Sequence, residues 1–250
     1  MFVHNINPVL LKIGFFEIRY YSLVYIFGFL LAYFLLLRVA KDKKVKGLTK
    51  QVVEDFMVYL MLGSIIGARL LYFVFYNPAV LWTNPFEVFF LWHGGMSFHG
   101  GLIGVIVAYF VFRRKHNVAF YDLADILVLP FAFTLFLGRI ANFINGELWG
   151  TLTNVSWCVK FPGVEGCRHP SQLYEALKNL FVFGILFSMK NVKKLKKGVV
   201  FWSFILLYGF GRFITDFWRE ETQLLGVSMG QFLSLVMVVV AIVYLYKLRK

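Results

Sequence analysis

The chain has 250 residues, of which 60% are hydrophobic and 20% aromatic, and its mean hydropathy is +0.71. Soluble domains are closer to half apolar, so this composition excludes an ordinary soluble globule and indicates an integral membrane protein. The formal net charge of +13 is high enough to suggest that the protein binds nucleic acid. However, the basic residues gather in short clusters between apolar stretches, which favours cytoplasmic loops beside anionic lipid over a nucleic-acid-binding surface.

Apolar stretches long enough to cross a bilayer, about 20 residues each, follow one another along the chain. They cover 21–38, 53–76, 96–112, 121–144, 171–189, 198–217 and 228–246. We therefore predict an all-α, polytopic membrane protein, a bundle of about seven transmembrane helices. Residues 1–250 would form a single integral membrane domain, whose longest polar connection is a short extracytoplasmic loop at about 145–170.

Lys and Arg are concentrated after alternate stretches, at 38–50, 113–115, 190–197 and 247–250. Short basic loops stay on the cytoplasmic side of a membrane. The pattern predicts an N-terminus outside, a cytoplasmic C-terminus and a place in the inner, cytoplasmic membrane.

Two early stretches each carry an ionisable residue at membrane depth, where a charge needs a partner or a water-filled cavity. Gly63 and Gly67 allow close helix packing, and Arg69 beside them is either a phosphate ligand or a member of a buried ion pair. His99 lies just inside the third stretch, in a segment with four glycines. It is either a hydrogen-bonded packing residue or a proton acceptor near neutral pH.

The fourth stretch ends in a polar cluster. At helical spacing, Arg139, Asn142 and Asn145 share one face, and Glu147 follows them. One guanidinium and two carboxamides suit a phosphate or glycerol head group. In the alternative interpretation, the carboxamides satisfy backbone groups where the helix unwinds, and Arg139 extends toward the membrane surface.

Both cysteines, Cys158 and Cys167, lie in the predicted outer loop. An oxidising compartment would permit a disulfide that braces the loop. A metal site is not expected, because no histidine pair stands at ligand spacing. In the sixth stretch, Arg212 and Asp216 stand four residues apart, so they can pair on one helix face. That pair either only lowers the cost of burial or holds Arg212 toward a phosphate.

Five strings, in order, resemble the prolipoprotein diacylglyceryl transferase family over essentially the whole chain. They are 93–101 (HGGMSFHGG), 138–150 (GRIANFINGELWG), 168–175 (RHPSQLYE), 208–219 and 228–231 (SMGQ). The chain departs from the family pattern at Ala141, where glycine is usual, and at Asp216, where glutamate is usual. Its outer loop is also shorter than in many relatives.

The resemblance implies transfer of a diacylglyceryl group from phosphatidylglycerol to the thiol of a lipobox cysteine in a preprolipoprotein, with release of glycerol phosphate and without metal or cofactor. It places the family's functional positions on Tyr21, His99, Arg139, Asn142, Glu147, Arg212 and Asp216. Asn145, Gly150, His169 and Arg69 are further candidate substrate contacts.

In the mechanism that these residues suggest, Arg139 and Arg212 hold the phosphate and His99 takes the thiol proton. Glu147 and Tyr21, which would orient the lipid head group together with Asn142, are alternative bases. A small membrane transporter or lipid flippase is the alternative function, although the internal repeat common in transporters is not evident.

Overall fold

The computed structural model describes the chain except residues 15, 190–191, 193–194, 221–222, 225–226 and 250. Its internal contacts define two compact units. The first unit consists of Met1–Ala32 together with Phe120–Lys250, and the second unit is Tyr33–Ala119. The predicted cytoplasmic residues Lys190, Lys193, Lys194 and Lys250 lie outside the described residues.

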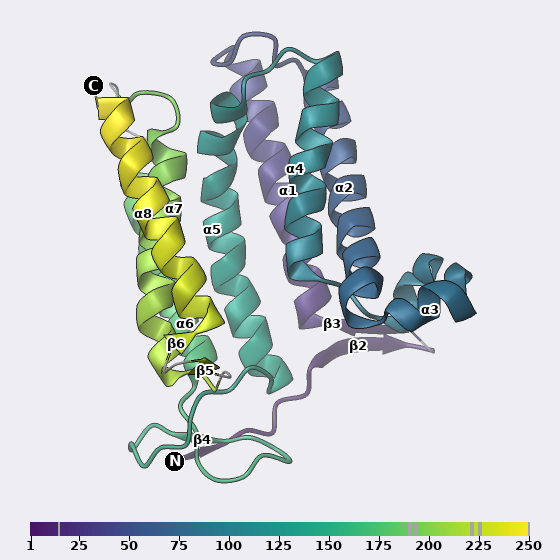
Figure 1. Ribbon diagram of the computed structural model, residues 1–250, viewed down its shortest axis with the longest axis vertical. Coiled ribbons are helices and arrows are strands. Elements are labelled where there is room, and N and C mark those ends of the chain that lie inside the picture. Colours follow the sequence, from purple (N-terminus) through teal and green to yellow (C-terminus); the bar gives the residue numbers. More distant parts are fainter. Residues whose placement is uncertain (15, 190–191, 193–194, 221–222, 225–226, 250) are drawn as a thin grey trace. The chain divides into compact units, whose positions relative to one another are not determined.

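All seven predicted stretches are helical (Figure 1). The long helices are α1 (Tyr20–Lys41), α2 (Lys50–Tyr76), α4 (Phe98–Lys115), α5 (Phe120–Asn145), α6 (Ser171–Met189), α7 (Val199–Thr215) and α8 (Met229–Arg249). Shorter helical turns are α3 (Pro78–Thr83), η1 (Pro85–Phe89), η2 (Leu91–His93) and η3 (Asp216–Trp218). The predicted helical fold is confirmed at this level.

Within the described residues, five helices are long and apolar enough to cross a membrane: α1, α2, α5, α7 with η3, and α8. The helix α4 ends in Arg113, Arg114 and Lys115, and it has only 18 residues in all. The first turns of α6 contain several polar residues, including Glu175 and Lys178. These charges explain why α4 and α6 are less apolar than the other five.

The first unit is organised around α5, α6 and α7, with α8 packed beside α7 (Figure 1). Its buried core combines side chains at helical spacing from three helices, which are Val128, Leu129 and Ala132 of α5, Val182 and Leu186 of α6, and Phe204 of α7. The apolar faces of these helices meet here. Their packing brings the ends of α5, α6 and α7 that carry polar residues to one place.

Short strands occur in the polar segments, which the all-α prediction did not include. The pairs are β1 (Phe2–Val3) with β4 (Val159–Lys160), β2 (Val9–Ile13) with β3 (Phe16–Arg19), and β5 (Gln223–Leu224) with β6 (Val227–Ser228). The first pair is parallel and the other two are antiparallel. They form where no helical pattern competes for the backbone hydrogen bonds.

The connection between α5 and α6 is an ordered loop, braced as the sequence allowed. Cys158 and Cys167 form a disulfide with their Cα atoms 5.6 Å apart. Arg168, next to the disulfide, is buried, donates to the carbonyl of Gly150 and forms an ion pair with Glu220. This loop therefore fixes the backbone that follows the polar end of α5.

In the second unit, α2 and α4 pack through glycines. A methyl group added at Gly67 would lie 2.4 Å from the carbonyl oxygen of Gly100, and one added at Gly104 would lie 2.0 Å from that of Gly63. Real side chains do not fit at such distances. The predicted role of Gly63 and Gly67 in close helix packing is confirmed.

Candidate active site

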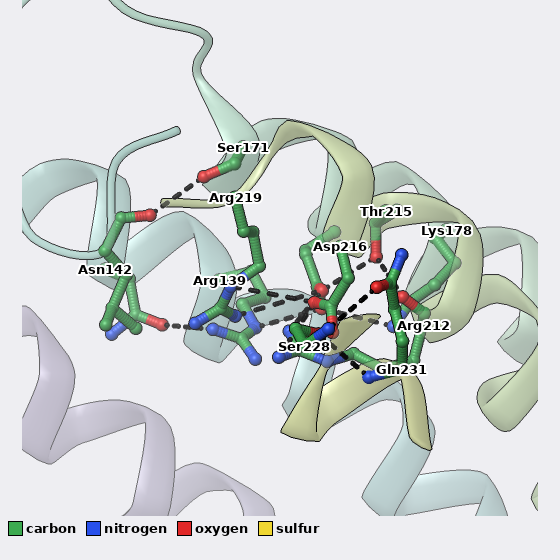
Figure 2. A network of polar contacts seen from close by, with 12 residues as sticks. Arg139, Asn142, Ser171, Lys178, Arg212, Thr215, Asp216, Arg219, Ser228 and Gln231 are labelled. Carbon is green, nitrogen blue, oxygen red and sulfur yellow. Dashed lines mark hydrogen bonds and ion pairs between the residues drawn. The ribbon is translucent and has the colours of Figure 1, made fainter. Parts of the chain in front are cut away.

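Two buried carboxylates of the first unit form ion pairs with a group of basic side chains (Figure 2). Glu175 comes from the second turn of α6 and Asp216 from the end of α7. Arg139, from α5, reaches Glu175, and Arg212, from α7, pairs with both carboxylates. The sequence predicted the two arginines and Asp216, whereas Glu175 received no role.

The carboxylate of Glu175 lies at the centre of this cluster, with its side chain only 1% exposed. One oxygen, Oε1, accepts from Arg212 Nη1 at 2.6 Å and from the Thr215 hydroxyl at 2.8 Å. The other, Oε2, lies 3.4 Å from Arg139 Nε and 3.1 Å from Lys178 Nζ. Arg219 approaches Oε1 at 4.0 Å. Burial of a carboxylate in such a dry place requires paired cations of this kind.

Asp216 pairs with Arg212 as the four-residue spacing predicted. Arg212 Nη2 lies 2.9 Å from Asp216 Oδ1. The second oxygen, Oδ2, accepts from the Ser228 hydroxyl at 3.1 Å. Ser228 and Gln231 form a capping box at the start of α8, because the side chain of each accepts from the backbone N–H of the other. The α8 terminus thereby holds Asp216, and Asp216 holds Arg212.

The polar residues predicted to share one face at the end of α5 do contact one another. Arg139 Nη1 donates to Asn142 Oδ1 at 3.5 Å. Asn142 and Asn145 both donate to Glu147 Oε1, at 2.7 and 3.1 Å. The carboxamide groups are therefore used to orient a carboxylate rather than backbone carbonyls. The helix stops before Gly146, whose positive φ of 67° lets the chain turn and bring Glu147 back toward Asn142.

Gly150 and His169 lie in the loop beside this face. Gly150 pairs through its backbone with His169 and with the segment at Arg219, and a side chain at Gly150 would collide with the Trp218 carbonyl at 2.3 Å. Close packing is thus sufficient to explain this glycine. The His169 ring is partly buried and lies 3.0 Å from the Tyr174 hydroxyl. Burial lowers the pKa of His169 below its ordinary value, which favours the neutral imidazole.

Tyr21 lies on α1 in the same unit. Its hydroxyl is 3.0 Å from the hydroxyl of Tyr25. An apolar cleft of about 260 Å³ lies between α1 and α5. It is lined by Tyr20, Leu23, Val24, Phe27, Leu137, Ile140, Ala141 and Ile144. The end of α5 therefore contributes Arg139 and Asn142 to the polar cluster and Leu137, Ile140, Ala141 and Ile144 to the apolar cleft.

His99 and Arg69 belong to the second unit. His99 is exposed near the start of α4, where Ser97 caps the helix. Arg69 is 2% exposed, and all five of its N–H groups donate to backbone carbonyls. The acceptors are the carbonyls of Glu87, Val88, Phe90, Gly94 and Gly95. Arg69 therefore has a structural role in holding segment 87–95, and the two interpretations given by the sequence, a phosphate ligand and a buried ion pair, do not describe these contacts.

Glu175 and Lys178 are the main site residues that sequence reasoning missed. Both interrupt the apolar stretch 171–189 and lie one helical turn apart. Charges within such a stretch are costly and point to a partner, so a signal was present. Which residues they contact was not readable, because the partners come from α5 and α7.

Comparison with known proteins agrees with these features. The profile of the prolipoprotein diacylglyceryl transferase family matches residues 8–247. Similar proteins named phosphatidylglycerol–prolipoprotein diacylglyceryl transferase occur in Geobacter sulfurreducens (44% identical, covering 92% of this chain and 90% of that protein), Bordetella parapertussis (43%, covering 98% and 97%) and Rickettsia canadensis (41%, covering 96% and 95%). The chain belongs to the prolipoprotein diacylglyceryl transferase family.

Proposed function

We propose that this protein transfers the diacylglyceryl group of phosphatidylglycerol to the thiol of the lipobox cysteine of preprolipoproteins. The observation that carries the proposal is the convergence of Arg139 and Arg212, from two helices, on one buried carboxylate. Arginines held in this way form a preorganised site for a phosphate. The apolar cleft between α1 and α5 suits the acyl chains of the same lipid.

The reaction needs a thiolate and a stabilised leaving group. The thiolate of the peptide attacks the glyceryl carbon, the bond from that carbon to the phosphate oxygen breaks, and glycerol phosphate leaves with the electron pair. Arg139 and Arg212 hold its negative charge as it develops. His99 is the proposed acceptor of the thiol proton. Asn142, Tyr21 and Glu147 orient the head group, and Glu147 and Tyr21 are the alternative bases.

Asn145, Gly150, His169 and Asp216 complete the proposed substrate-binding region. Asn145 holds Glu147, and Asp216 holds Arg212. The backbone at Gly150 and the ring of His169 lie in the loop that follows. In this proposal the four residues support the bound head group.

The proposed setting is the inner membrane, with about seven spans in a single domain, an outside N-terminus and a cytoplasmic C-terminus. In this arrangement α4 and α6 also cross, and α6 directs Glu175 and Lys178 into the protein. Single cysteines introduced at Lys44, Lys115 and Lys194 should react with a thiol reagent only from the cytoplasmic side. Labelling of any of the three from outside contradicts this topology.

The activity can be tested directly with purified protein in micelles that contain phosphatidylglycerol. A lipobox peptide should gain a thioether-linked diacylglyceryl group, and glycerol phosphate should appear in equal amount. A peptide with serine in place of the lipobox cysteine is the matched control. Movement of lipid across vesicles without a covalent product would instead indicate a transporter or flippase.

A further inference from the structure

We propose that Glu175 is a positioning residue for the transfer reaction, which fixes the separation and orientation of the Arg139 and Arg212 guanidinium groups. The inference rests on the proposed function, in which these two arginines bind the phosphate. In this proposal Glu175 acts through the two arginines and does not itself touch the substrate.

The geometry divides the carboxylate between the two arginines. Oε1 accepts from Arg212 Nη1 at 2.6 Å, and Oε2 lies 3.4 Å from Arg139 Nε. Arg139 comes from α5, Arg212 from α7 and Glu175 from α6. Because both oxygens belong to one planar group, the distance between the two guanidinium groups is set by a single side chain. Two cations would otherwise repel each other at this spacing.

The carboxylate is itself held on its other sides. The Thr215 hydroxyl donates to Oε1 at 2.8 Å, and Lys178 Nζ lies 3.1 Å from Oε2. Lys178 also lies 4.2 Å above the centre of the Tyr208 ring. Oε1 is therefore held by Arg212 and Thr215, with Arg219 at 4.0 Å, and Oε2 by Arg139 and Lys178. A side chain that is fixed in this way and 1% exposed can transmit its position to the arginines.

A purely structural explanation competes with this one. Glu175 and Lys178 are three residues apart on α6 and form a buried ion pair. If the carboxylate only neutralises Lys178, removing both charges together should be tolerated, because replacing a complete buried pair is often neutral. If the carboxylate positions the arginines, removing Lys178 as well cannot restore their geometry. The double variant therefore separates the two roles.

The experiment compares Glu175→Gln, Lys178→Met and the double variant Glu175→Gln/Lys178→Met with the wild-type protein. The exposed Glu165→Gln serves as the matched control for the substitution. Turnover is measured against phosphatidylglycerol and against lipobox peptide, and thermal stability is measured in the same detergent. Both readouts are needed because a fall in folded protein lowers kcat without changing KM.

We expect Glu175→Gln to lower kcat/KM for phosphatidylglycerol at least about a hundredfold, the typical effect of disturbing preorganised donors. Its KM for the lipid should rise while that for the peptide stays within about twofold, because the peptide does not use this cluster. Lys178→Met leaves Arg139, Arg212 and Thr215 in contact with Glu175, so it should lower kcat/KM for phosphatidylglycerol less than Glu175→Gln does. The double variant should regain thermal stability and remain as inactive as Glu175→Gln.

Recovery of near-wild-type turnover in the double variant would overturn the positioning role and leave Glu175 as the partner of Lys178. A Glu175→Gln variant that loses kcat alone, in proportion to its loss of folded protein, would overturn it too. Wild-type protein that forms no thioether product would instead overturn the proposed function, and this inference with it. The wild-type control therefore distinguishes the two failures.

Discussion

Replacing Arg139 by lysine should abolish most activity while leaving the protein folded. The Arg139 side chain is 18% exposed, so its contacts are largely shielded from water. Nε faces Glu175, and Nη1 donates to Asn142. Among the described contacts, this leaves Nη2 for a phosphate oxygen. A lysine ammonium is a point charge without this fork, so it cannot serve the carboxylate, the carboxamide and the phosphate in the same geometry.

Loss of one preorganised donor typically costs about 3 kcal/mol in the transition state, or about a hundredfold in rate. Turnover with phosphatidylglycerol and thermal stability should be measured in one detergent, with the exposed Arg19→Lys as control. Arg19→Lys should behave like wild type in both. A stable Arg139→Lys variant with near-normal turnover would refute the forked phosphate contact, because charge alone would then be sufficient.

Asp216→Asn should weaken turnover less than Arg212→Ala, because Asn keeps an oxygen for Arg212 while Ala removes a phosphate ligand; the reverse order indicates a catalytic carboxylate. Replacing Cys158 and Cys167 together by serine should lower the unfolding free energy by about 2–3 kcal/mol, as estimated for opening a short loop, and an unchanged denaturation midpoint would contradict this. Since burial lowers the pKa of His169, the unfolded chain takes up the proton first below about pH 6.5, so stability should fall there more steeply than in His169→Gln; parallel pH profiles of Tm would count against it.

Local patterns in the sequence were sufficient for the helices and for contacts within them. The apolar stretches became α1, α2 and α4–α8 within a few residues of the expected ends. The pairing of Arg212 with Asp216 and the shared face of Arg139 with Asn142 also followed from spacing. Both reflect the geometry of a single helix, in which residues three or four apart are neighbours whatever surrounds them.

Membrane topology lies partly beyond such patterns. Length and apolarity identify five spanning helices among the described residues. The helices α4 and α6 carry charges that lower their apolarity, and whether they cross depends on what the charges contact. For α6, Glu175 and Lys178 meet each other and residues of α5 and α7. These ion pairs neutralise the buried charges only in the packed protein, so the sequence of the helix alone does not show whether it can cross the membrane.

The roles of Arg69 and Glu175 were decided by tertiary structure. In sequence, both are charges in largely apolar helices with several possible partners. Arg69 donates all its hydrogen bonds to five backbone carbonyls of a segment roughly 20 residues away. Glu175 pairs with Arg139 and Arg212, which lie 36 and 37 positions away in the sequence. Helical periodicity fixes which side of a helix a charge occupies, but its partner depends on which helix faces meet, and that is set by the packing of several helices at once.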